Sequence, residues 1–364
     1  MGKIVAFFLQ VGQSKRSAMS AMSRVYAALI ACLIVTTILA AQLKVDVALV
    51  NIVATVTDQK GRYVSDLTED DLIVEEDGQV QKISHFDLSN DLPVSVGLLL
   101  DTSGSMERKI ATAASSVERF LRTIHKDDDI FLMTFSARPS LRQDFTDDRE
   151  KLARALRQVA VGGGTALYDA LDESLRKIKR GKHDKKAIIL ISDGEDTSSY
   201  ATFNDALGSV RESELLVYAL GISPAGGRIM SEGIPRTGGP SIGNPFPWPG
   251  IPGIPGGGGG RRWPLAPQGR GRPGANPDTV DMNVLNAFAD ASGGKAWLLS
   301  GSWSGNRGNE IQNALDEIAA ELRNQYSIGY YPSHPLKDGK WHRIEVRAKN
   351  PKYHVRARKE YFGK

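Results

Sequence analysis

The chain has 364 residues, 41% of them hydrophobic, and this length predicts two domains with a buried core plus accessory segments. Its formal net charge is only +4, and basic and acidic residues alternate along most of the chain, a pattern that indicates a solvated surface and excludes a nucleic-acid partner. The single cysteine, Cys32, excludes an internal disulfide framework and a cysteine zinc site.

The amino-terminal segment, residues 1–42, predicts export. Residues 25–41 carry no charge and follow Lys15, Arg16 and Arg24. This run is longer than a secretory core of about 7–15 residues and shorter than a spanning helix of about 20 residues. A cleaved signal peptide and a retained membrane anchor are therefore both open. We expect the mature chain in the periplasm or cell envelope, either secreted or anchored by this segment.

Residues 43–91 predict β-strands. Apolar residues recur at close to alternate positions over residues 45–57, and Leu72–Glu76 and 80–86 flank Asp77-Gly78, a favoured two-residue hairpin turn. A unit of only a few strands is not stable alone, and these strands therefore need a partner sheet.

The carboxyl-terminal residues 325–364 supply candidates for that partner. Strand patterns occur at residues 325–331, 341–348 and 353–362. We expect them to pair with the amino-terminal strands in a small β-sandwich. Its polar face is expected to carry a set of basic residues: Lys352, Arg356, Arg358 and Lys359.

Residues 92–324 predict a different architecture, in which strands and helices alternate. Apolar runs predict strands at 94–100, 130–135, 187–191, 215–220 and 295–299, and helical spacing predicts helices at 110–124, 167–178, 203–210, 285–289 and 311–322. This alternation is typical of an α/β fold with a doubly wound, mostly parallel sheet flanked by helices. The predicted fold class is therefore α/β with an added β-sandwich.

Residues 223–280 interrupt the alternation with repeated glycine and proline, including five consecutive glycines at 256–260. Such a composition cannot bury enough surface to offset its ordering entropy, so we expect a disordered insertion. Its arginines and tryptophans leave an arginine–aromatic binding arm as the alternative to a tolerated surface insertion.

Oxygen-bearing side chains lie at the predicted strand ends. Asp101, Ser103 and Ser105 directly follow the first buried strand, Thr165 precedes a helix, and Asp193 follows another buried strand. Ligands bind outside the carboxyl ends of strands in open α/β sheets. Carboxylate and hydroxyl oxygens are hard ligands that suit Mg²⁺.

Asp101-x-Ser103-x-Ser105 with distant Thr165 and Asp193 resembles the metal-ion-dependent adhesion site of von Willebrand factor type A domains. The resemblance covers residues 92–324 and implies a Rossmann-like fold. It implies that Ser103, Ser105 and Thr165 bind Mg²⁺, or alternatively Mn²⁺ or Ca²⁺, through their hydroxyls. Asp101 and Asp193 would act directly or through waters.

The same resemblance implies a binding module instead of an enzyme. A protein partner would present an Asp or Glu carboxylate to the ion, with no small-molecule substrate and no catalytic residues. Movement of the helix at 311–322 would regulate affinity. The flanking segments 51–53, 67–72 and 75–78 further resemble bacterial secreted von Willebrand factor A-related proteins.

Each site residue has a structural alternative. Ser103, Ser105 and Thr165 can cap helices, and Asp193 can belong to an ordinary Asp-Gly turn. A structural envelope protein without metal-dependent binding is therefore the first alternative. We expect the neighbouring acidic residues, Glu195 and Asp196, to form a solvated rim.

A metal-dependent hydrolase is the second alternative. Ser103 occupies the position of the second aspartate in Asp-x-Asp-x-Thr phosphatases, which removes the general acid. None of the six histidines has another histidine or a cysteine nearby at ligand spacing, so we expect surface or packing roles for them.

Overall fold

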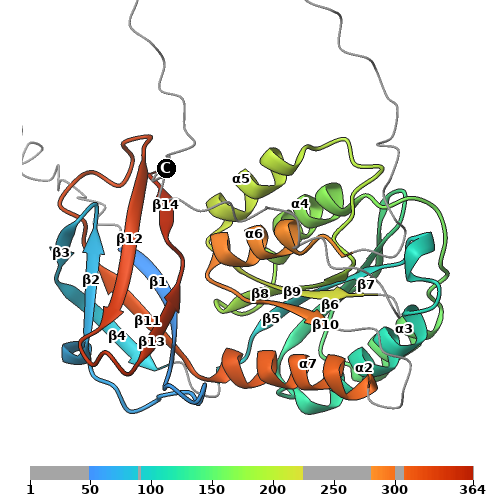
Figure 1. Ribbon diagram of the computed structural model, residues 1–364, viewed down its shortest axis with the longest axis horizontal. Helices are drawn as coiled ribbons and strands as arrows, with labels where there is room; N and C mark the ends of the chain where they lie inside the picture. The colour runs from blue at the N-terminus through green and yellow to red at the C-terminus, as the bar shows by residue number, and fades with distance from the viewer. Residues whose placement is uncertain (1–48, 89–91, 224–279, 300–306, 364) are drawn as a thin grey trace, which may run out of the picture. The chain divides into compact units, whose positions relative to one another are not determined.

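The computed structural model describes residues 49–88, 92–223, 280–299 and 307–363, which all belong to one compact unit, Leu49–Lys364 (Figure 1). The predicted export segment, 1–42, and nearly all of the predicted insertion, 223–280, lie outside the described residues. Among the helices that are described, none combines the length and the apolar character needed to cross a membrane. The boundaries proposed for the domains stay a prediction.

The central sheet has six strands in the order β10-β9-β8-β5-β6-β7. They are β5 (Ser95–Asp101), β6 (Asp129–Phe135), β7 (Pro139–Thr146), β8 (Lys186–Ser192), β9 (Leu216–Ile222) and β10 (Ala296–Leu299). All neighbours are parallel except β7, which runs antiparallel to β6. Because the chain places β6 on one side of β5 and β8 on the other, the strand order reverses at β5. Such a reversal is where open α/β sheets bind ligands.

Helices cover both faces of this sheet (Figure 1). The helices α2 (Ile110–Thr123) and α7 (Arg307–Arg323) pack on one face, and α4 (Leu167–Ile178), α5 (Phe203–Ser213) and α6 (Met282–Ser292) pack on the other. Strands β5, β6 and β9 are buried along their whole length, as expected for strands covered on both faces. The predicted doubly wound α/β fold is confirmed.

Two elements of this part were not predicted. The edge strand β7 has four exposed and four half-buried residues and so lacks an apolar signal, and the short helix α3 (Arg149–Arg157) buries only three residues. At the edge of the sheet, β7 pairs with β6 on one side and has solvent on the other, so its side chains are less completely covered. A strand in this position needs no continuous apolar run.

The remaining strands form two four-stranded antiparallel sheets, in the orders β13-β1-β11-β4 and β14-β12-β2-β3. The strands are β1 (Val50–Thr57), β2 (Leu72–Glu76), β3 (Gln79–Gln81), β4 (Ile83–Leu88), β11 (Gln325–Tyr330), β12 (Trp341–Ala348), β13 (His354–Ala357) and β14 (Glu360–Phe362). Strands from both ends of the chain are paired, β1 with β11 and β2 with β12. Apolar residues of both sheets share one core, which confirms the predicted β-sandwich.

Two predicted strands are each divided between the two sheets. The predicted hairpin turn is confirmed, because Asp77 and Gly78 both have positive φ, 48° and 81°, as a type I′ turn requires. Only β3 continues that hairpin, however, and β4 crosses to pair with β11. The predicted strand 353–362 divides in the same way into β13 and β14. A segment that crosses between packed sheets must break its ladder, and local periodicity does not reveal the break.

The basic carboxyl-terminal residues also differ in part from expectation. Lys352 and Lys359 are exposed, but Arg358 is buried, and its Nη1 lies 2.9 Å from the Glu214 carboxylate at the end of α5. Arg356 forms an ion pair with the buried Glu321 of α7. These two arginines therefore connect the sandwich to the α/β part instead of facing solvent.

We predict that Gly97→Ala lowers the free energy of unfolding by about 1–3 kcal/mol, because overpacking a filled core forces side chains to move. A Cβ at Gly97 in β5 would lie 2.5 Å from the Phe131 ring and 2.6 Å from Ile188 Cδ1. The matched control is Gly208→Ala in α5, where a Cβ meets nothing within 4 Å. It should stabilise the protein by about 0.5–1 kcal/mol, since alanine is the better helix former. Urea unfolding measures both changes, and equal signs would contradict the prediction.

Candidate metal centre

The turn that follows β5 holds Asp101 in a fixed orientation. Its side chain is fully buried. Asp101 Oδ1 accepts a hydrogen bond from the Ser103 backbone N–H at 2.8 Å, and Oδ2 accepts one from the Ser192 hydroxyl at 2.6 Å. Ser192 ends β8, so the carboxylate spans the two strands that flank the reversal in strand order.

The two serine hydroxyls of the turn are adjacent. Ser103 Oγ and Ser105 Oγ lie 3.0 Å apart. Neighbouring ligands of an octahedral Mg²⁺ ion, at metal–oxygen distances of 2.0–2.1 Å, are separated by about 3 Å. Ser103 precedes the 3₁₀ turn Gly104–Met106 but makes no side-chain capping hydrogen bond. The helix-capping alternative therefore finds no support at Ser103.

The glycine-rich loop with Thr165 is tied to the same turn. Gly162 N–H donates to the Thr102 carbonyl at 2.9 Å, and Gly104 N–H donates to the Gly163 carbonyl at 3.1 Å. These backbone hydrogen bonds hold the loop beside the serines. Thr165 is itself buried, only 4% exposed.

The start of α4 is capped by a residue other than Thr165. Asp196 Oδ1 accepts hydrogen bonds from the N–H groups of Leu167 and Tyr168 at 2.8 and 3.3 Å and from the Ser199 hydroxyl at 2.6 Å. The prediction of a solvated rim is therefore wrong for Asp196. A capping role at α4 does not account for Thr165.

Asp193 brings a second buried carboxylate to the site from the end of β8. The Lys109 ammonium lies 3.4 Å from Asp193 Oδ2 and is buried as well. Burial, followed by the charge of Asp193, raises the pKa of Asp101 to about 6. Sequence reasoning missed Lys109 because no motif marks it, and only the fold brings it to Asp193.

The chemistry of this donor set fits a divalent cation. Two carboxylates and three hydroxyls, all hard oxygen donors, come from the three segments that meet at the strand reversal: Asp101, Ser103, Ser105, Thr165 and Asp193. The buried Lys109 ammonium offsets one of the two carboxylate charges, so the described residues of the site keep a net negative charge. Mg²⁺ prefers oxygen ligands and a site with negative charge in proteins, so this donor set suits it.

Comparison with known proteins places this region in a family. The sequence model of the von Willebrand factor type A domain matches residues 96–195. An uncharacterized protein of Synechocystis sp. is 28% identical over 135 residues, 36% of this chain and 32% of that protein. Calcium-activated chloride channel regulator 1 of Equus caballus is 30% identical over 154 residues, 40% of this chain and 16% of that protein. The chain thus spans a third or less of the length of these curated relatives.

A solved structure described as von Willebrand factor type A from Catenulispora acidiphila is 12% identical, covers 86% of this chain and 72% of its own, and has a TM-score of 0.43. The family match begins one residue into β5 and ends two residues after Asp193, so it encloses all five candidate ligands. Residues 96–195 therefore belong to the von Willebrand factor type A domain family.

Proposed function

We propose that this chain is an exported protein-binding module that holds a partner's carboxylate through a divalent cation, Mg²⁺ or alternatively Mn²⁺ or Ca²⁺. The observation that carries the proposal is the meeting of two buried carboxylates and three hydroxyls at the strand reversal. Export is supported by the charge-free residues 25–41 that follow basic residues. Binding, and not catalysis, is the proposed role.

The roles of the residues follow from their charge and burial. Ser103, Ser105 and Thr165 would bind the ion through neutral hydroxyls, while Asp101 and Asp193 supply negative charge directly or through water. A divalent cation with mostly neutral direct ligands stays electrophilic and accepts a further anionic oxygen. Hydrogen bonds from Ser103 and Ser192 fix the orientation of the Asp101 carboxylate. Ion binding would therefore require little rearrangement of this side chain.

Calorimetric titration of Mg²⁺ and Mn²⁺ into the full-length chain tests the proposal. We expect one saturable site, with affinity reduced at least tenfold in Asp101→Ala and Thr165→Ala because each change removes an oxygen ligand or its charge. Thr165→Ser keeps the hydroxyl and should keep most of the binding. This rescue separates a ligand role from a packing role of the threonine methyl group.

The control removes a hydroxyl elsewhere. Ser115→Ala on the exposed side of α2 deletes a hydroxyl that donates to the Thr112 carbonyl at 3.0 Å, and it should leave the affinity unchanged. If the folded parent chain binds neither ion, or if Thr165→Ala binds as well as Ser115→Ala, the metal-dependent function is rejected. A purely structural domain would then be the better account.

A further inference from the structure

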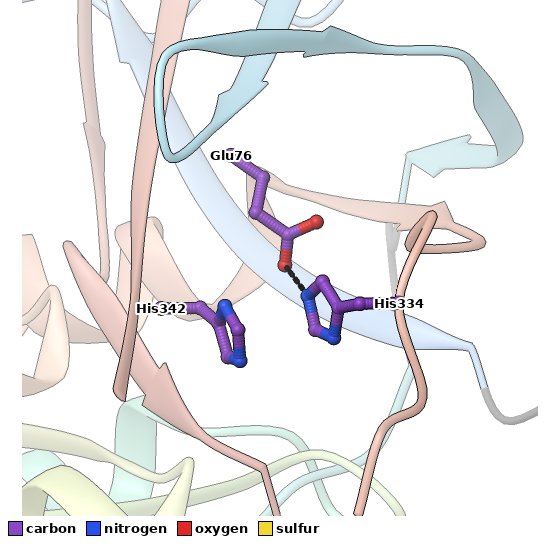
Figure 2. A group of neighbouring side chains, drawn as sticks. All are labelled: Glu76, His334 and His342. Carbon is purple, nitrogen blue, oxygen red and sulfur yellow. Dashed lines mark hydrogen bonds and ion pairs between the residues drawn. The ribbon is translucent and has the colours of Figure 1, made fainter. Parts of the chain in front are cut away.

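A second group of metal-binding side chains lies in the β-sandwich, away from the strand reversal. Glu76 ends β2, His342 lies on β12, and His334 lies in the connection between β11 and β12. Figure 2 shows the three side chains directed toward one another from these separate segments. One ligand atom from each lies within 4.8 Å of the other two.

The two histidines differ from the expectation of unrelated surface or packing roles. They are separated by eight positions in sequence, yet the rings of His334 and His342 stack with centroids 3.8 Å apart and planes 12° apart. The connection between β11 and β12 returns the chain and brings the rings together. A spacing rule for metal motifs misses such a pair, because the return of the chain is a property of the sandwich.

Glu76 brings an incompletely satisfied carboxylate to the histidines. Only 2% of the residue is exposed. Its Oε1 accepts from the Tyr361 hydroxyl and lies 3.1 Å from His334 Nε2. Its Oε2 is buried and has no hydrogen-bond partner within the described part of the chain. A buried carboxylate oxygen without a partner is costly, and in native proteins such an oxygen commonly binds water or a cation.

The charges around the histidines also favour a bound cation. His342 Nδ1 lies 2.8 Å from Asp77 Oδ2, and His342 Nε2 lies 3.1 Å from Asp338 Oδ2. With Glu76, three carboxylates thus surround two stacked imidazoles. A divalent cation held by the rings and Glu76 would offset part of this negative charge.

We propose that Glu76, His334 and His342 form a Zn²⁺ site. Two imidazole nitrogens and one carboxylate oxygen match the ligands that zinc takes in proteins, whereas Mg²⁺ prefers oxygen alone. The Asp338 carboxylate is placed to orient His342 through Nε2, because a ligating histidine commonly gives its other ring nitrogen to a carboxylate. His342 Nδ1 would then bind the ion in place of its contact with Asp77.

The proposed ion would fasten the two ends of the chain within the sandwich. His334 and Glu76 are 258 positions apart in sequence. Binding to the folded state alone stabilises it by mass action. The site is separate from the Asp101 site in residues, location and metal preference, so the two proposals stand or fall independently.

The test uses the full-length chain stripped of metal with a chelator and then titrated with Zn²⁺ in a calorimeter. We expect one zinc equivalent at this site and a rise in melting temperature with zinc. His334→Ala and His342→Ala should each weaken zinc binding by at least about a hundredfold, more than the loss of an orienting partner, and abolish the thermal shift. Asp338→Asn should weaken it less, about tenfold, because that residue only orients a ligand.

Two matched controls accompany these variants. His85→Ala removes an exposed histidine of β4, and Asp101→Ala removes a ligand of the other candidate site; both should retain zinc binding at the sandwich. Since His342 is buried and its alanine variant can fail to fold, Co²⁺ titration of the unaltered chain gives a second readout. Intense visible d–d absorption is expected of cobalt in a four- or five-coordinate site with nitrogen ligands.

Three results would overturn the zinc site: a cobalt spectrum as weak as that of the hydrated ion, zinc affinity in His334→Ala equal to that in His85→Ala, or loss of zinc only in Asp101→Ala. Retention of zinc together with failure to bind Mg²⁺ would reject the Asp101 site and leave the zinc site standing.

Discussion

Replacing Glu321 with alanine is expected to lower the free energy of unfolding by about 3–5 kcal/mol, the range for breaking a buried charge pair. Glu321 lies on α7 and is 1% exposed. Its Oε1 accepts from the Tyr218 hydroxyl at 2.8 Å and the Thr55 hydroxyl at 3.3 Å, and its Oε2 pairs with Arg356. The substitution removes the acceptor of two buried hydroxyls and the counterion of a largely buried guanidinium. These partners come from β1, β9 and β13, so the loss affects both parts of the molecule.

Guanidinium chloride unfolding of the purified variants measures this change. Glu118→Ala is the matched control, because Glu118 lies on the surface of α2 and pairs at 2.8 Å with Arg157, whose side chain is 53% exposed. Exposed pairs contribute about 0–1 kcal/mol, so the control should change little. Equal losses in the two variants would show that the Glu321 network does not hold the sandwich to α7.

Replacing Lys109 with methionine is expected to lower the free energy of unfolding by about 3 kcal/mol when divalent ions are removed by a chelator. Lys109 and Asp193 are buried, their side chains 6% and 1% exposed, and Asp101 is a second buried carboxylate beside Asp193. Without the ammonium, two buried negative charges lack a counterion. Methionine fills similar volume, so the loss reports charge and not a cavity.

Added Mg²⁺ should restore part of this loss if the metal proposal is correct, because the ion supplies the missing positive charge. The melting temperature of Lys109→Met should therefore rise with Mg²⁺ by more than that of the parent chain. Lys151→Met is the control, since Lys151 pairs at 3.8 Å with Asp148 on the surface. If Lys109→Met is destabilised but its melting temperature does not respond to Mg²⁺, the structural role of Lys109 is supported. The proposal that a cation binds at Asp101 and Asp193 is then contradicted.

The five candidate ligands were predictable as a set because each lies where a local pattern ends. The apolar run of β5 stops at Asp101, and that of β8 stops before Asp193. Parallel strands bring their carboxyl ends to one edge, so residues far apart in sequence become neighbours without any knowledge of contacts. Whether these residues bind a cation stays a prediction until ions are titrated. The partners Lys109, Ser192 and Asp196 carried no such signal, because their roles depend on which loop packs against which.

The sequence alone determined the order and type of most elements, since apolar periodicity is a local property and burial on one or both faces of a sheet imposes it directly. It also indicated that strands from the two ends of the chain need each other. Only the tertiary structure decided how those strands divide between two sheets, which arginines turn inward to Glu321 and Glu214, and that His334 and His342 stack beside Glu76. These features depend on contacts between segments that lie up to about 300 positions apart, as between Asn51 and Arg358. The free energy of such contacts comes from burial and charge pairing in the folded state. Neither segment alone carries a sequence pattern that reveals this burial or pairing.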